Sequence, residues 1–335
     1  MGDVLPPDRQ QELRSWVATA LGDPAPSLEP ASADASFRSY FRTTSGGRSY
    51  VVMDAPPPQM DCRPFLRVAG LLREAGLHVP EIFAQDLSRG FLLLEDLGRQ
   101  TYLDVLDAGN ADRLFSDAIS ALILWQRATR PGILPPYDRA FLHRELMLFP
   151  EWYVTRHLKL ELTAMDSMAL QDAFKLLEDS ALAQPQVYMH RDYMPRNLMV
   201  SAPNPGVLDF QDAVMGPVSY DIISLFRDAF ISWPETRVQE WRHKYWDLGR
   251  HVGLPLPADP KEFARASDWM GMQRHLKILG LFARIHHRDA KHQYLKDTPR
   301  FLGYLREVGR LYKEFTPLLR LLDKLEKQAA LAGSV

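Results

Sequence analysis

The feature that most constrains the fold is a polar run set between short apolar segments near the middle of the chain. Residues 187–189 and 198–200 are β-forming runs, and the eight residues between them, from His190 to Asn197, read His-Arg-Asp-Tyr-Met-Pro-Arg-Asn. Turn-forming residues follow, and a third short strand ends at Asp209. The alternation predicts small strands joined by loops, and the polar side chains fall in those loops.

Asp192, Asn197 and Asp209 provide the groups that phosphoryl transfer from Mg-ATP requires. One carboxylate must orient the acceptor hydroxyl, while an amide and a second carboxylate hold Mg²⁺ against the phosphates. Mg²⁺ takes one or two carboxylates beside phosphate oxygens and water, which suits these side chains. We therefore expect Asp192 to be the catalytic base, and Asn197 and Asp209 to bind the metal. In the alternative interpretation, His190 and Asp192 only cap a turn.

The same residues carry a family resemblance. The pattern H-R-D-x-x-x-x-N followed by L-D-F resembles the catalytic and metal-binding loops of the protein-kinase-like superfamily, and residues 216–222 resemble its aminoglycoside phosphotransferase branch. The resemblance implies an α+β, bilobal protein-kinase-like fold. A small mixed β-sheet N-lobe, residues 1–97, would bind the nucleotide, and a larger, mostly helical C-lobe, residues 98–335, would carry catalysis and substrate binding. It also implies that His190 shapes the catalytic loop and that Asp221 braces it.

A closer resemblance comes from several segments together. Residues 34–42, 52–57, 95–98, 190–197 and 273–277 are similar to those of the bacterial N-acetylmuramate/N-acetylglucosamine anomeric kinases. This resemblance implies a cytoplasmic enzyme of peptidoglycan recycling with ATP and Mg²⁺ as cofactors. Its partner would be a small-molecule amino sugar, phosphorylated at the anomeric hydroxyl.

Two departures argue against a protein kinase. Met194 stands where a Ser/Thr kinase typically has Lys, and only eleven residues separate Asp209 from Asp221. This spacing leaves no room for an activation segment that docks a peptide, so a small hydroxyl compound is the expected acceptor. An aminoglycoside kinase, or another small-molecule hydroxyl kinase, remains an alternative. A second alternative is an inactive nucleotide-binding module.

The nucleotide site follows the kinase pattern only in part. Residues 91–98 are similar to an adenine-binding hinge, with Glu95, Asp96 and Leu97 as its expected contacts. The preceding strand, however, offers Met53 or Asp54 where a kinase presents a Lys to the α- and β-phosphates, and no G-x-G-x-x-G loop is present. Another part of the chain must therefore contact the phosphates.

The candidate for that task is the turn and strand at residues 34–42. Backbone N–H groups and the Ser36 hydroxyl could line phosphate oxygens, with Arg38 or Arg42 supplying positive charge. The alternation of residue types along this stretch equally fits a half-buried strand whose arginines are exposed. Both interpretations stay open at this point.

Two groups of residues are candidates for binding the acceptor. Glu145 and the segment 149–153 form an acidic and aromatic cluster in which Trp152 could stack on a sugar, although buried aromatic residues usually serve packing. The second group is a basic series at helical spacing, Arg274, Lys277, Arg284 and Arg288. One of these cations could bind the lactyl carboxylate of N-acetylmuramate bidentately. The alternative is a solvated helix face.

Composition bounds the remaining possibilities. The chain has 335 residues, 46% of them hydrophobic, and a formal net charge of −2, which is ordinary for a soluble enzyme and does not favour a nucleic-acid partner. A single cysteine, Cys62, excludes an intrachain disulfide and fits a reducing cytosol. No apolar stretch reaches the roughly 18 residues of a membrane span. We expect no membrane association and no obligate protein partner.

Helical periodicity dominates the chain from Thr101 onward. A first helix is expected to open at Pro6-Pro7 and to end at Gly22, and a second to span residues 65–75. The later helices are expected at residues 112–129, 166–182, 220–230, 237–252, 268–288 and 301–324.

Overall fold

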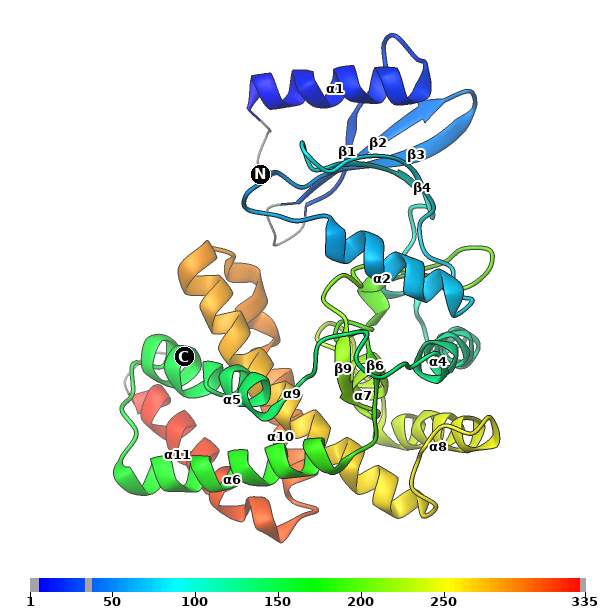
Figure 1. Ribbon diagram of the computed structural model, residues 1–335. Helices are drawn as coiled ribbons and strands as arrows, with labels where there is room; N and C mark the ends of the chain where they lie inside the picture. Colours follow the sequence, from blue (N-terminus) through cyan, green and yellow to red (C-terminus); the bar gives the residue numbers. More distant parts are fainter. Residues whose placement is uncertain (1–5, 34–37, 332–335) are drawn as a thin grey trace. The chain divides into compact units, whose positions relative to one another are not determined.

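The computed structural model describes residues 6–33 and 38–331. The chain divides into two compact units, which are treated separately here and can be followed by colour in Figure 1. The first unit contains Met1–Val105 and Arg196–Asp212, and the second contains Leu106–Pro195 and Ala213–Val335. The segment 196–212 thus belongs with residues far upstream of it. The division of roles between residues 1–97 and 98–335 stays a prediction.

The first unit is built on a five-stranded sheet with the strand order β1-β2-β3-β5-β4. Every neighbouring pair is antiparallel. The β2–β3 turn contains Gly46 and Gly47, with φ angles of 57° and 79°, a conformation that glycine adopts without steric cost. The strands are β1 (Glu29–Ala33), β2 (Ser39–Ser45), β3 (Arg48–Asp54), β4 (Ile82–Asp86) and β5 (Phe91–Glu95).

Helix α1 (Pro7–Leu21) packs on this sheet and ends at Gly22 as predicted. Its buried side chains form one apolar cluster with residues of β3 and β5, consisting of Leu13, Trp16, Val17, Val52, Phe91 and Leu93. Arg9 of α1 donates to the fully buried Asp54 of β3, with 2.5 Å between Nη2 and Oδ1. Burial raises the pKa of Asp54, and Arg9 opposes that rise. Asp54, which stands near the place of the missing lysine, therefore fastens α1 to the sheet.

The rest of the first unit is helix α2 (Arg63–Glu74), the short α3 (Tyr102–Val105) and the hairpin formed by β7 (Leu198–Met199) and β8 (Gly206–Val207). We call residues 196–212 the hairpin segment. Val207 N–H donates to the carbonyl of His78 at 2.8 Å, and Val200 N–H donates to that of Gln100 at 2.9 Å. A Cβ on Gly206 would lie 2.8 Å from Leu97 Cδ1, so the hairpin approaches the Leu97 side chain closely at this glycine.

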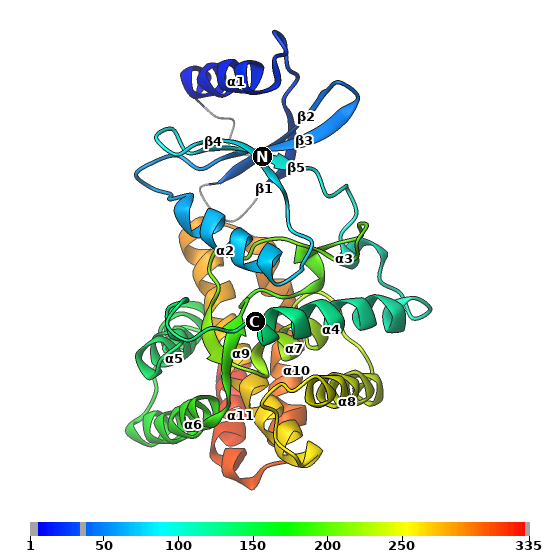
Figure 2. The same ribbon diagram turned by 45° about the vertical axis from the view of Figure 1, so that its right-hand side comes forward.

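The second unit is mostly helical, as Figure 2 shows. Its only sheet among the described residues pairs β6 (Gln186–Met189) with β9 (Val214–Pro217) in antiparallel register. The helices are α4 (Ala111–Arg127), α5 (Arg139–Leu146), η1 (Phe149–His157), α6 (Ala164–Ala183), α7 (Tyr220–Phe226), α8 (Glu235–His251), α9 (Pro260–Asp289), η3 (His292–Asp297), α10 (Thr298–Gly309), η4 (Lys313–Phe315) and α11 (Thr316–Leu331), with η2 (Pro195–Asn197) at the border between the units.

The central element of the second unit is the long helix α9, whose middle is almost entirely buried. Its closest neighbour is η1, a π-helix of nine residues. A Cβ on Gly280 would lie 2.1 Å from the backbone carbon of Leu148, directly before η1. Gly280 is therefore needed for the two backbones to approach so closely, although glycine weakens a helix interior.

The predicted helices are present, with three changes. The helix expected at residues 220–230 already ends at Phe226. The helix expected at residues 301–324 is two helices, α10 and α11, separated at residues 310–315. Gly309 ends α10, and its Cβ position lies 2.8 Å from Leu319 of α11, so the two helices pack closely where the chain turns. The helix expected at 268–288 begins earlier, at Pro260, where the Asp259 carboxylate caps it by accepting from Lys261 N–H. A sheet-based unit followed by a helical one confirms the α+β class.

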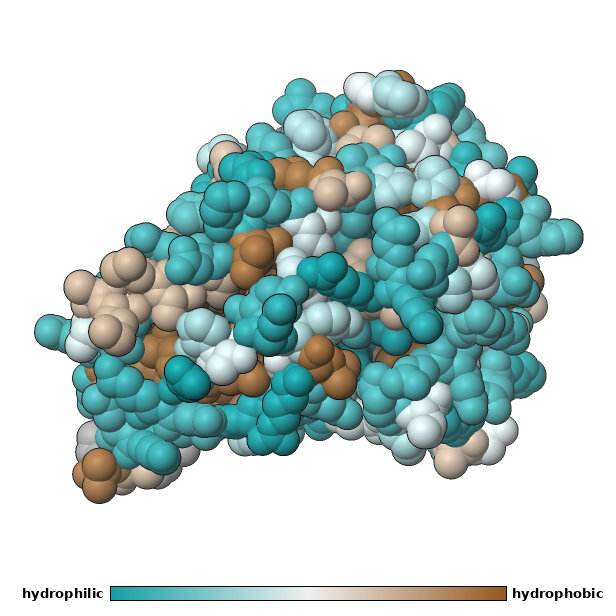
Figure 3. All heavy atoms as spheres, turned by 90° about the horizontal axis from the view of Figure 1, so that it is seen from below, coloured by the Kyte–Doolittle hydropathy of each residue, from teal (hydrophilic) through white to brown (hydrophobic). Residues whose placement is uncertain are grey.

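The surface is largely hydrophilic in the view from below, with smaller apolar areas between the polar side chains (Figure 3). Apart from Leu331 at the end of the described residues, the most exposed large apolar side chains are Met165 of α6 and Leu311, which are 80% and 67% exposed. Within the described ranges, no helix is both long and apolar enough to cross a membrane.

Candidate active site

The loop after β6 is held by a single buried carboxylate. Asp221, in the first turn of α7, accepts from His190 N–H at 2.7 Å and from Arg191 N–H at 3.0 Å. Asp221 is completely buried, and burial raises its pKa to about 7 against the opposing effect of these two N–H groups. The predicted contact between Asp221 and the loop is confirmed.

Further contacts shape the same loop around Asp192. The ring of His190 is buried, and its Nδ1 accepts from Asp192 N–H at 3.3 Å. The ring also packs edge-on against Tyr193, whose hydroxyl donates to the carbonyl of Ala118 at 2.8 Å. Arg191 has a φ of 77°, a strained value for a residue with a side chain. His190 therefore shapes the loop, while the role of Asp192 as the base stays a prediction.

The two expected metal ligands lie together in the hairpin segment. Asn197 Nδ2 lies 3.4 Å from Asp209 Oδ2. A backbone hydrogen bond also joins the two strand ends, because Leu208 N–H donates to the Asn197 carbonyl at 2.9 Å. Asp209 has a φ of 60°, a left-handed conformation that is uncommon for a residue other than glycine. Such outliers concentrate at functional sites.

Gln211 completes this cluster and was not predicted. Its Nε2 donates to Asp209 Oδ1 at 2.8 Å, while its Oε1 is buried and has no hydrogen-bond partner in the described parts of the chain. A buried oxygen without a donor beside a carboxylate suits a cation or its bound water. The donor set of Asn197, Asp209 and Gln211 thus fits Mg²⁺. The sequence signal was present, because Gln211 directly follows the L-D-F motif.

Two of the expected nucleotide-binding residues bind each other. Arg42 of β2 donates to Asp96 through Nε at 2.5 Å and Nη2 at 3.0 Å, and also to the carbonyl of Gly98 at 2.9 Å. Ser49 donates to the same carboxylate at 2.5 Å. Burial alone would raise the pKa of Asp96, but these donors outweigh it and the pKa is lowered. Arg42 therefore ties the sheet to the hinge, which argues against a direct contact with phosphate.

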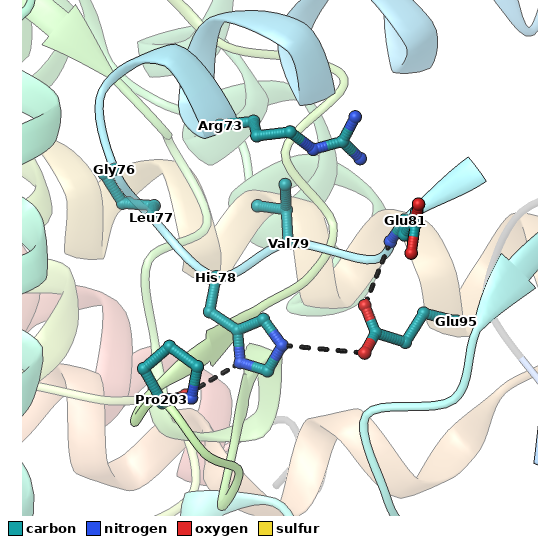
Figure 4. Close-up of a pocket in the computed structure, with 8 residues that line it drawn as sticks. All are labelled: Arg73, Gly76, Leu77, His78, Val79, Glu81, Glu95 and Pro203. Atoms are coloured by element: carbon teal, nitrogen blue, oxygen red, sulfur yellow. Dashed lines mark hydrogen bonds and ion pairs between the residues drawn. The ribbon is translucent and has the colours of Figure 1, made fainter.

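Glu95 points into a pocket of about 350 Å³ between the hinge and the loop after α2 (Figure 4). Its carboxylate accepts from Glu81 N–H at 3.2 Å and lies 4.0 Å from His78 Nε2. His78 Nδ1 is 2.7 Å from the carbonyl of Pro203 at the tip of the hairpin segment, to which it must donate. His78 thus joins the hinge to the segment that carries Asn197 and Asp209.

The remaining nucleotide residues are only partly described. Ser36 lies outside the described residues. Arg38 directly precedes β2 and is buried, and its charge opposes the rise that burial causes in the pKa of the Cys62 thiol. Leu97 is buried beside the hairpin segment. The contacts of these residues with a nucleotide stay predictions.

Glu145 is the centre of a buried polar network in the second unit. It accepts from Arg191 at 2.8 Å and from Lys277 at 2.9 Å, and Tyr137 donates to its other oxygen. Burial would raise the pKa of Glu145, but the two cations outweigh it and the pKa is lowered. Lys277 also donates to the Tyr220 hydroxyl at 3.1 Å. Both carboxylate oxygens of Glu145 therefore already have partners. This position favours a structural role for Glu145 over the predicted role in sugar binding.

The other expected acceptor residues are spread over the second unit. Arg274 is 2% exposed, and its charge acts on Asp221 and Asp228 within the core. Arg288 is exposed and pairs with Asp289 at 2.7 Å. Trp152 of η1 is half-buried, and the guanidinium of Arg156 lies 4.9 Å from the centre of its ring. Glu145 and Lys277 are thus paired, and the Arg274 guanidinium lies 6.0 Å from the centre of the Tyr220 ring, whose hydroxyl Lys277 contacts. Trp152 and Arg288 have other partners, and the roles of all five residues in binding stay predictions.

Comparison with known proteins identifies a family and relatives of this chain. The profile of the Phosphotransferase enzyme family matches residues 27–262. The chain is 55% identical over 331 residues to the N-acetylmuramate/N-acetylglucosamine kinase of Pseudomonas aeruginosa, which covers 96% of this chain and 98% of that protein. It is 46% identical over 322 residues to the kinase of the same name from Neisseria meningitidis serogroup B, with 95% and 96% covered.

Solved structures show the same fold at low sequence identity. The choline kinase LicA from Streptococcus pneumoniae superposes with a TM-score of 0.64 at 13% identity, covering 90% of this chain and 99% of that one. This similarity confirms the predicted kinase-like fold. The family match spans more than half of the sequence and includes the braced loop and the hairpin segment. The chain therefore belongs to the phosphotransferase enzyme family.

Proposed function

We propose that this protein is an ATP-dependent kinase that phosphorylates the anomeric hydroxyl of N-acetylmuramate and N-acetylglucosamine. The observation that carries the proposal is the 55% identity with a kinase of that name over nearly the whole of both chains. The loop braced by Asp221 and the pair formed by Asn197 and Asp209 support the reaction type. An enzyme with these acceptors would serve peptidoglycan recycling in the cytoplasm.

In the proposed reaction, Asp192 orients the anomeric hydroxyl and takes its proton as the oxygen attacks the γ-phosphorus of ATP. A bond forms between this oxygen and phosphorus, the bond from phosphorus to the β,γ-bridging oxygen breaks, and ADP leaves. Asn197, Asp209 and Gln211 would hold Mg²⁺, which when bound neutralises charge on the phosphates. The tie between Arg42 and Asp96 would keep the hinge in place for the nucleotide.

The proposal is tested by a coupled assay of ADP release with both sugars, their methyl glycosides and an aminoglycoside, with the product identified by phosphorus NMR. The two free sugars should give 1-phosphates, and the methyl glycosides, whose anomeric hydroxyl is blocked, should not react. A 6-phosphate product, or turnover of the aminoglycoside alone, would refute it.

Two variants separate the roles within the site. Asp192→Ala should abolish turnover and leave Mg-ATP binding within about 3-fold, because the base contacts the acceptor. Asp209→Ala should abolish turnover and also weaken nucleotide binding in the presence of magnesium. Asp247→Ala, which removes an exposed carboxylate of α8, is the control and should leave both unchanged. Unchanged nucleotide affinity in Asp209→Ala would remove that residue from the metal site.

A further inference from the structure

The basic residues on the second half of α9 differ in their partners. Lys277 is paired with Glu145, and Arg288 is paired with Asp289. Arg284, which lies between them, forms no ion pair and no hydrogen bond with any residue in the described ranges, and its Nε is buried. It is thus a half-buried cation whose buried Nε–H has no acceptor within the described ranges.

Such a position is unfavourable in the absence of a ligand. A guanidinium has five N–H donors, and burying even one of them, here that of Nε, without an acceptor has a cost in free energy. Burial and the neighbouring Arg288 lower the pKa of Arg284, which shows that nearby carboxylates do not balance its charge. An anion that reached Arg284 would gain a charge-assisted, bidentate contact at little further cost in desolvation.

The helix places Arg284 at a suitable distance from the catalytic loop. Lys277 is joined to that loop through Glu145 and Arg191. Arg284 lies seven residues after Lys277, which puts it on the same face of α9, within about 20° and about 10 Å further along the axis. This face begins at the residues that hold the loop and continues toward the end of the helix. A sugar with its hydroxyl at the loop could extend a substituent along it.

We propose that Arg284 is the residue that binds the acceptor's carboxylate and so determines the preference for N-acetylmuramate over N-acetylglucosamine. The inference rests on the proposed function, because only N-acetylmuramate carries a lactyl carboxylate. The other basic residues of the series are less suited: Arg274 is enclosed in the core near Asp221, and Lys277 is occupied by Glu145. Arg288 already has a carboxylate partner.

The test combines a change in the residue with a change in the substrate. The kcat/KM values of wild type, Arg284→Gln and Arg284→Lys are measured with N-acetylmuramate, its methyl ester and N-acetylglucosamine. Lys261→Gln, which removes an exposed cation in the first turn of the same helix, is the matched control. Arg284→Gln should lower kcat/KM for N-acetylmuramate by about 10- to 100-fold, which is the value of one charged hydrogen bond, and change the other two substrates by less than about 3-fold. Arg284→Lys should restore part of the loss, and the control should behave as wild type.

The outcomes separate a failure of the Arg284 assignment from a failure of the proposed function. Loss confined to the charged substrate supports the assignment, since a folding defect would affect all three substrates equally. Equal losses for all three, or no loss for any, would overturn the assignment while the proposed function stood. If the wild type phosphorylated none of the three, the proposed function would fail and the assignment with it.

Discussion

Replacing Asp221 by Asn should make the protein more resistant to unfolding at alkaline pH and, at the same time, less active. The carboxylate is completely buried and braces the catalytic loop through two N–H groups. Asn has nearly the same shape but no charge to bury. It also has only one acceptor oxygen, and its NH₂ group would face an N–H donor.

The magnitude follows from the pKa of Asp221, which burial raises from 3.8 to about 7. Because the folded state keeps the proton that the unfolded state releases, stability falls as the pH rises between these values. Between about pH 4.5 and about pH 8 this one group should lower the free energy of unfolding by about 3 kcal/mol. Asp221 lowers the free energy of unfolding least at a pH below its pKa in the unfolded state. It lowers it most at a pH above its pKa in the folded state. Asp221→Asn removes this dependence.

The measurement is urea unfolding of both proteins at several pH values across that range, together with kcat at neutral pH. Subtracting the two stability curves cancels the other titrating groups, and the difference should shift by about 3 kcal/mol in favour of the variant as the pH rises. The kcat should fall by about 10- to 100-fold, because one loop amide loses its acceptor and Asp192 is less well placed. A pH-independent difference in stability would refute the argument from burial, and full activity would refute the bracing role.

Two further predictions concern packing and the hinge. Gly280→Ala should destabilise the protein by about 1–3 kcal/mol in thermal or urea unfolding, because its Cβ would meet the backbone of Leu148 at 2.1 Å. Gly303→Ala in α10, where no atom lies within 4 Å, should instead be neutral or stabilising by up to about 1 kcal/mol; a loss of equal size there would contradict the packing argument. Arg42→Ala and Asp96→Ala should each raise the KM for ATP by about 10-fold, and the double variant should be no worse than either single one. Additive losses would show that Arg42 has a separate task, such as a direct contact with phosphate.

Local patterns in the sequence were sufficient for most of the elements. The end of α1 could be predicted because Gly22 adopts a left-handed conformation that stops a helix. The break between α10 and α11 was not predicted, because apolar residues continue through it at helical spacing, although Pro317, the second residue of α11, is a signal for it. It depends on how closely Gly309 packs against Leu319, and that contact exists only once the chain has folded back.

Some residues of the candidate site could likewise be predicted from the sequence, and others could not. The H-R-D-x-x-x-x-N motif and Asp221 could be connected from the sequence because the resemblance fixes both. The position of Glu145 could not be predicted, because its partners Arg191 and Lys277 come from distant parts of the chain. The partner of Arg42 could not be predicted for a similar reason, because Asp96 directly follows a different strand, β5. Long-range pairing of charges leaves no periodic signal.

The place of the hairpin segment in the first unit has a consequence for how the chain is made. A ribosome releases residues 1–105 well before residues 196–212, so the first unit cannot be completed when its own strands emerge. Until then the carbonyl of His78 lacks Val207 N–H, and that of Gln100 lacks Val200 N–H. The first unit therefore stays incomplete until residues 106–195, less than half of the helical unit, have also been synthesised. A fragment that ended at Val105 would keep this incomplete state permanently.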